Sequence, residues 1–230
     1  MQALKFCMLN QTEIKELIHQ QGLLPLYFHE DADVSIEILK ALHTAGIRII
    51  EYTNRGGNAL INFKKMKGEC AENYKDMLLG AGTIKSADAA NAFINAGVDF
   101  LISPAYIDEV FDVCTEKNIL WIPGCMTPTE IAKAESKGIN VIKIFPGSLL
   151  GPSYITALRE IFPTIMFMPT GGVSLDKNNL QQWFASGVAA VGMGSKLISK
   201  EILAEKNYPV ITQLTKQVMD AIKEIRSANK

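Results

Sequence analysis

The stretch Ser136–Pro146, SKGINVIKIFP, joins the end of an amphipathic run to an apolar run through a single glycine. A glycine just past a helix takes the left-handed conformation that ends it, and the apolar run that follows starts the next element. The same arrangement occurs in HQQGLLPLYF (19–28), HTAGIRIIEYT (43–53), NAGVDFLISP (95–104) and FASGVAAVGMG (184–194). The sequence therefore predicts a chain in which helices and strands alternate.

Three further apolar runs, DMLLGAGT, ILWIPG and TIMFMPTGG, complete a set of eight predicted strands. Their ranges lie near residues 23–29, 47–53, 77–83, 100–104, 120–124, 140–146, 165–171 and 189–194. Helical patterns separate them, such as TPTEIAKAESKG, which has Pro128 in its first turn, where proline favours a helix start.

Strict alternation of strand and helix indicates a parallel sheet, and eight repeats in 230 residues suit a (β/α)8 barrel. We expect one α/β domain over residues 1–230, a TIM barrel with extra helices at residues 1–20 and 201–230. A doubly wound open sheet is the alternative, although no G-x-G-x-x-G follows the first predicted strand.

Composition excludes several function classes. The formal net charge is −1 and no basic patch stands out, so neither nucleic acid nor a membrane surface is an expected partner. No apolar run is long enough to cross a bilayer, and the N-terminus has no cleavage signature. The four cysteines lack C-x-x-C spacing, which favours reduced thiols and a cytoplasmic location.

Lys143 stands at the centre of the predicted strand in SKGINVIKIFP, where burying an unpaired ammonium is costly. Side chains alternate between the two faces of a strand, and the face toward the helices must be apolar. This rule turns Ile142 and Ile144 outward, and it turns inward Val141, Lys143 and Phe145.

The same rule applied to the second strand turns inward Ile47, Ile49, Glu51 and Thr53. Glu51 and Lys143 then both point into the barrel near the upper ends of their strands. One interpretation is a buried structural ion pair. The other is a nucleophilic lysine beside a carboxylate that transfers protons.

Further candidate residues follow the strands, since barrels of this kind carry their active sites at the carboxyl ends of the strands. Thr83 closes the third strand and Arg55 follows the second, and an arginine with a hydroxyl is suited to bind a carboxylate. Loops after strands seven and eight often bind phosphate through backbone N–H groups. The candidate phosphate-binding residues in these loops are Gly171, Gly172, Gly194 and Ser195.

Metal chemistry is not expected. The three histidines, His19, His29 and His43, show no ligand spacing, and the cysteines are scattered. The sequence therefore predicts neither a metal site nor a cofactor.

Seven motifs in order, IIEYTNRG, GAGT, ISPA, PGCMTPTE, VIKIFP, MPTGGV and GMGS, resemble those of a known family. It is that of the 2-keto-3-deoxy-6-phosphogluconate (KDPG) aldolases, also called 4-hydroxy-2-oxoglutarate (KHG) aldolases. The resemblance runs from about residue 23 to 200. It implies a homotrimeric (β/α)8 lyase of carbohydrate metabolism (the Entner–Doudoroff pathway) that releases pyruvate through a lysine Schiff base, without metal.

By this resemblance Lys143 is the Schiff-base lysine, Glu51 the general acid/base, and Arg55 with Thr83 holds the substrate carboxylate. The resemblance also assigns the pocket wall to Pro104 and Phe145, and the phosphate of the keto-acid substrate to Gly171, Gly172, Gly194 and Ser195. Two alternatives keep Lys143 as a salt-bridge partner only: another phosphate-binding barrel enzyme, such as an epimerase, and a non-catalytic sensor of a sugar-acid phosphate.

Overall fold

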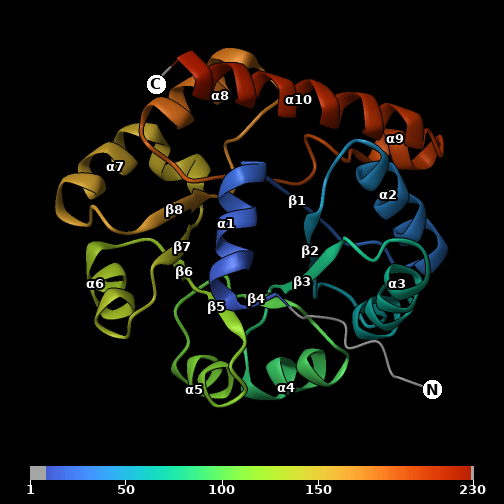
Figure 1. Cartoon of the computed structure of the whole chain (residues 1–230), viewed down its shortest axis with the longest axis horizontal. Coiled ribbons are helices and arrows are strands. Elements are labelled where there is room, and N and C mark those ends of the chain that lie inside the picture. Colours follow the sequence, from blue (N-terminus) through green and yellow to red (C-terminus); the bar gives the residue numbers. More distant parts are fainter. Residues whose placement is uncertain (1–8, 229–230) are drawn as a thin grey trace.

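Helices and strands alternate along the chain, as the sequence predicts (Figure 1). The computed structural model describes residues 9–228, so Cys7 and the first part of the predicted N-terminal helix lie outside the described residues. The strands are β1 Leu23–Tyr27, β2 Ile49–Thr53, β3 Leu78–Gly82, β4 Phe100–Ile102, β5 Leu120–Ile122, β6 Gly124–Cys125, β7 Val141–Ile144, β8 Met166–Pro169 and β9 Val191–Met193.

The helices are α1 Gln11–Gln21, α2 Ala32–Thr44, α3 Ala59–Asn73, α4 Ala87–Asn95, α5 Asp108–Glu116, α6 Pro128–Ser136, α7 Gly147–Ile161, α8 Lys177–Ala185, α9 Lys200–Ala204 and α10 Tyr208–Ala228. Local sequence sets their ends. Gly22 ends α1 in the left-handed conformation, and Thr127 begins α6 through a reciprocal capping box with Glu130.

The strands form a curled parallel sheet of six, in the order β5-β4-β3-β2-β1-β9, and a second sheet of three, in the order β6-β7-β8. Every predicted strand is present, and the fifth is divided into β5 and β6 at Pro123, which has no N–H to donate to a ladder. A parallel bridge between Thr170 and Gly192 links β8 to β9, and Ala189 N donates to Phe167 O at 2.9 Å. The fold is thus a single mixed α/β domain.

Two apolar clusters cover the two faces of the strands. The inner cluster consists of Ile14, Ile18, Leu24, Ile49, Phe100, Ile102, Leu120, Ile122, Val141, Met168 and Ala190. The larger outer cluster, which includes Ile142 and Ile144, packs the strands against the surrounding helices. The predicted directions of Val141, Ile142 and Ile144 are confirmed. The prediction for Ile47 is wrong: β2 begins only at Ile49, so the alternation does not reach Ile47, which belongs to the outer cluster.

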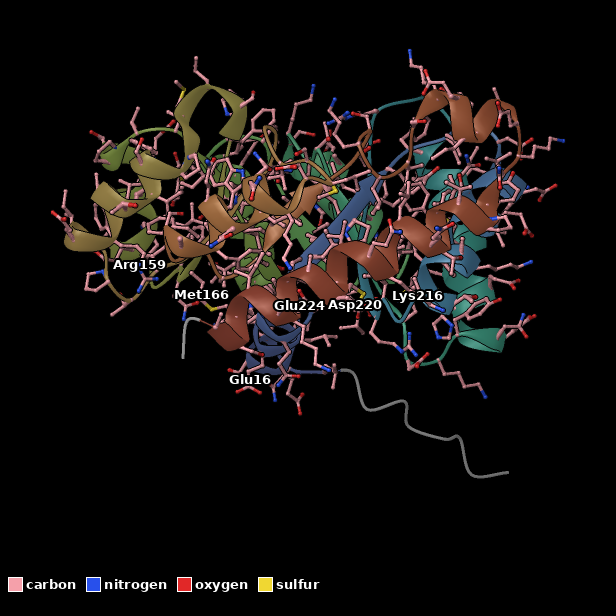
Figure 2. All side chains as sticks on the ribbon, turned by 90° about the horizontal axis from the view of Figure 1, so that it is seen from above. Glu16, Arg159, Met166, Lys216, Asp220 and Glu224 are labelled. Carbon is pink, nitrogen blue, oxygen red and sulfur yellow. The ribbon has the colours of Figure 1, made fainter. Side chains whose placement is uncertain are left out.

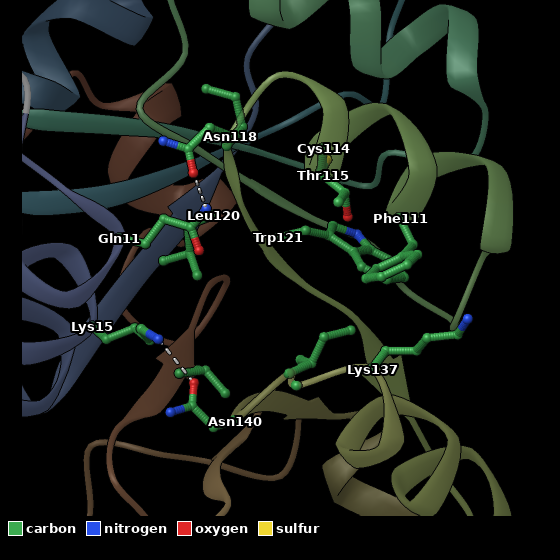
Figure 3. Close-up of a pocket in the computed structure, with 14 residues that line it drawn as sticks. Gln11, Lys15, Phe111, Cys114, Thr115, Asn118, Leu120, Trp121, Lys137 and Asn140 are labelled. Atoms are coloured by element: carbon green, nitrogen blue, oxygen red, sulfur yellow. Dashed lines mark hydrogen bonds between the residues drawn. The ribbon is translucent and has the colours of Figure 1, made fainter.

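Helix α1 covers the amino-terminal end of the strands, and it lies across the centre of the view in Figure 1. Its buried residues Ile14 and Ile18 join the inner cluster. Two hydrogen bonds of 3.0 Å fasten it, from Gln11 to Asn118 before β5 and from Lys15 to Asn140 before β7 (Figure 3). The interior is therefore filled and covered at this end.

Helix α10 packs along the outside of the domain (Figure 2). Its buried residues are Ile211, Thr215, Val218, Ile222 and Ile225, whereas Lys216, Asp220 and Glu224 are exposed. Arg226 donates to backbone carbonyls of α1 and of the segment before β9. The predicted C-terminal helical region is confirmed. Within residues 9–228 no helix combines the length and the hydrophobicity that crossing a membrane requires.

Candidate active site

Lys143 and Glu51 meet inside the domain although they belong to different sheets. Lys143 Nζ lies 3.3 Å from Oε1 and 3.4 Å from Oε2 of Glu51. Lys143 is 5% exposed and Glu51 0%, so water screens this pair little. Lys143 is the next-to-last residue of β7, and Glu51 is the middle residue of β2. An amine and a carboxylate that can exchange a proton are therefore held together in a water-poor place.

The pocket-wall candidates lie around the lysine. Lys143 Nζ is 5.6 Å from the centre of the half-buried Phe145 ring. Gly124 is the register partner of Lys143, and a Cβ on Gly124 would come within 2.3 Å of the backbone of Pro104. The backbone after β4 thus lies close to the strand that pairs with β7 beside Lys143.

The two carboxylate-binding candidates differ in how they are held. Thr83 is half-buried directly after β3 and has a φ of 61°, a strained conformation for a β-branched residue. Such strain costs about 1–3 kcal/mol and is typical of functional sites. Arg55 lies in the loop after β2, where it is exposed. Its guanidinium makes no hydrogen bond or ion pair with any residue of 9–228, and it remains apart from Lys143 and Glu51.

The two glycine-rich loops lie side by side, because the bridge between Thr170 and Gly192 joins the strands that precede them. Gly171 and Gly172 have φ values of 90° and 73°, which favour glycine, and a Cβ on Gly172 would be 2.7 Å from Ser148 Cα. The backbone at the start of α7 therefore packs against this loop. Gly194 and Ser195 follow β9, and Ser195 is exposed.

Thr170 is a candidate that the sequence reasoning missed. Its side chain is nearly buried, yet Oγ1 has no hydrogen-bond partner among the described residues. A buried hydroxyl without a partner is costly, so a bound molecule is a natural partner for it. The sequence signal was present in MPTGG, where a threonine ends a strand directly before the glycine pair.

Burial raises the pKa of the nearby Cys125 thiol to about 12, so the thiolate nucleophile is scarce at neutral pH. Within residues 9–228, no three histidine, cysteine or acidic side chains gather as a metal site. The cavity in Figure 3 lies at the other end of the strands, between Gln11, Lys15 and Trp121.

Known proteins resemble this chain over most of its length. A 2-dehydro-3-deoxy-phosphogluconate aldolase of Treponema pallidum is 31% identical over 91% of this chain and 97% of that protein. A 2-dehydro-3-deoxy-6-phosphogalactonate aldolase of Escherichia coli is 32% identical over 63% of this chain and 70% of that protein.

A solved KDPG aldolase of Legionella pneumophila, with pyruvate captured as a covalent carbinolamine intermediate, has a TM-score of 0.81. It is 26% identical, with 89% of this chain and 97% of that chain covered. The family model described as KDPG and KHG aldolase matches residues 14–214, which include the whole candidate site. The chain therefore belongs to the KDPG and KHG aldolase family.

Proposed function

We propose that this protein is a class I aldolase that forms a Schiff base on Lys143. It cleaves 2-keto-3-deoxy-6-phosphogluconate to pyruvate and glyceraldehyde 3-phosphate, 4-hydroxy-2-oxoglutarate to pyruvate and glyoxylate, or both. The observation that carries the proposal is the buried contact of 3.3 Å between Lys143 Nζ and Glu51 Oε1. An amine nucleophile and a base for the proton transfers lie within one hydrogen bond of each other.

The reaction begins when the neutral amine of Lys143 attacks the C2 carbonyl, and loss of water from the carbinolamine gives an iminium. Glu51 takes the proton of the C4 hydroxyl as the C3–C4 bond breaks, and the electron pair flows into the iminium to form an enamine. Glu51 then returns a proton to C3, and hydrolysis releases pyruvate and the free amine. A positioned acid/base group of this kind contributes about 10²–10⁴-fold to the rate.

Other residues bind the ends of the substrate. Thr83 and Arg55 hold the carboxylate, which requires the exposed Arg55 side chain to turn toward the site when substrate binds. Pro104 and Phe145 form the walls beside Lys143. The phosphate lies against the backbone of the two neighbouring loops, at Gly171, Gly172, Gly194 and Ser195. Thr170 Oγ1, buried and without a hydrogen-bond partner among residues 9–228, donates to a hydroxyl of the substrate chain.

We also propose that the two sheets close into one (β/α)8 barrel over the single domain of residues 1–230. The bridge between Thr170 and Gly192 and the contact between Lys143 and Glu51 support this closure, since each joins the two sheets. We place the protein in the cytoplasm as a homotrimer, in keeping with the free cysteines Cys70, Cys114 and Cys125 and with its family. Exposed apolar side chains such as Leu149 (70%) and Ile161 (64%) offer surface for a second copy to cover. Light scattering should then give three times the chain mass of 25.3 kDa.

Trapping with borohydride tests the function. Pyruvate plus borohydride should inactivate the enzyme, and peptide mass spectrometry should find the reduced adduct on Lys143. Lys143→Met, which keeps most of the side-chain length but removes the amine, should give no adduct and should be inactive on every keto acid. An epimerase or a non-catalytic sensor would give no adduct in the unchanged protein. A panel of gluconate and galactonate keto acids then identifies the substrate by pyruvate release.

A further inference from the structure

The carboxyl group of Glu51 occupies the space above a glycine of the neighbouring strand. In the ladder between β2 and β3, Glu51 pairs with Gly80 and Thr53 pairs with Gly82. The Glu51 side chain leans toward the carboxyl end of the sheet, over Gly82. A Cβ placed on Gly82 would lie 1.8 Å from Oε1 and 2.5 Å from Cδ of Glu51. The carboxylate thus fills the volume that any side chain at position 82 would need.

Backbone conformation does not explain why this position is glycine. Gly82 does not have a positive φ, and it pairs in regular register with Thr53 of β2. Gly82 is the last residue of β3, where glycine loses more conformational freedom on folding than alanine would. What glycine provides at position 82 is the space that a side chain would fill, and the Glu51 carboxylate occupies that space.

We propose that Gly82 is a positioning residue: its lack of a side chain lets the Glu51 carboxylate lie within reach of Lys143 Nζ. The catalytic importance of this contact rests on the proposed function. The geometric part of the proposal, that the Glu51 carboxylate needs the space over Gly82, does not. With a methyl group at position 82, the fully buried Glu51 must move its carboxylate away from its present place. A displacement of about 1 Å can cost on the order of 10²-fold in rate when geometry matters.

Gly82→Ala tests the proposal, with Gly80→Ala as its matched control. Gly80 lies two residues earlier on β3, and a Cβ there would come within 2.2 Å of the buried Phe100 ring instead of Glu51. Both variants should therefore lose stability. Only folded Gly82→Ala should lose about 10²-fold in the exchange of pyruvate methyl protons with deuterium, while it still forms the borohydride-trapped adduct. Folded Gly80→Ala should exchange normally.

Two combinations separate positioning from general damage. Adding Glu51→Gln to Gly82→Ala should cost little more exchange, since both changes act on the same carboxylate and neighbouring changes are not additive. Glu51→Asp, which shortens the side chain by one methylene, should destabilise the unchanged protein but stabilise Gly82→Ala, because the shorter carboxylate clears the new methyl group. Thermal unfolding alone can detect this reversal in the sign of the stability change. The test therefore remains decisive if Gly82→Ala is too unstable for activity measurements.

Multiplicative losses in the Glu51→Gln combination, or normal exchange in Gly82→Ala, would overturn the catalytic role of this position. A crystal structure of Gly82→Ala with the carboxylate still 3.3 Å from Lys143 Nζ would overturn the geometric part as well. Absence of a pyruvate adduct in the unchanged protein would instead refute the proposed function. In that case the crystal structure and the Glu51→Asp reversal still decide whether Gly82 positions Glu51.

Discussion

Removing one charge of the buried pair should destabilise the protein far more than removing both. Lys143 is 5% exposed and Glu51 0%, so neither group can turn to water when its partner is lost. Breaking such a pair costs about 3–5 kcal/mol. At this chain length about 1 kcal/mol shifts Tm by roughly 2–4 °C. Glu51→Gln should therefore lower Tm by at least about 6 °C.

The double variant Glu51→Gln/Lys143→Met leaves no buried charge, and replacing a whole buried pair is often nearly neutral. Its Tm should lie well above that expected from adding the two single losses, a non-additivity of several kcal/mol that scanning calorimetry at pH 7 can measure. Strictly additive losses, or a Tm for Glu51→Gln within about 1 °C of the unchanged protein, would refute the coupling inferred from the contact.

Three further outcomes are expected. Gly172→Val should weaken phosphorylated substrates much more than 4-hydroxy-2-oxoglutarate, because a side chain at Gly172 would meet Ser148 in the proposed phosphate loop; equal losses on both substrates would mean that the loop only shapes the fold. Activity should survive prolonged treatment with a chelator, and activity that is lost and then restored by a divalent ion would contradict the class I assignment. Because burial raises the pKa of Cys70, Cys114 and Cys125 to about 12, the reactive thiolate forms only as the pH rises toward that value. Iodoacetamide at pH 8 should thus label these cysteines slowly until denaturant is added, as peptide mass spectrometry can follow; rapid labelling of the native protein would contradict their burial.

The strands could be predicted because the signals that end one helix and start the next strand are local in sequence. A glycine ends a helix through its own backbone freedom, and the alternation of side chains then follows from strand geometry alone. These two rules place Lys143 and Glu51 inside the domain without reference to any contact between strands. The same local rule failed at Ile47, since the first residue of a strand depends on where its neighbour pairs. In the structure, β2 begins opposite Leu78, at Ile49.

Sequence patterns could not predict the contacts between strands. The space above Gly82 belongs to Glu51 only because of the β2–β3 register and the lean of one side chain. That Thr170 Oγ1 has no hydrogen-bond partner among the described residues is likewise visible only when its neighbours are in place. The predicted carboxylate site is only partly assembled, with Thr83 at the end of β3 and Arg55 turned to solvent.

Helix α1, fastened over one end of the strands, has a kinetic consequence for an aldolase of the proposed kind. The inner apolar cluster fills the space between α1 and Lys143, so molecules enter and leave only past the carboxyl ends of the strands. In the proposed reaction pyruvate remains covalently attached to Lys143, deeper than the aldehyde, and a phosphorylated aldehyde carries its phosphate toward the proposed phosphate loops. The two products should accordingly depart in a fixed sequence, aldehyde first. Product inhibition should then be competitive with the cleaved substrate for pyruvate and noncompetitive for the aldehyde.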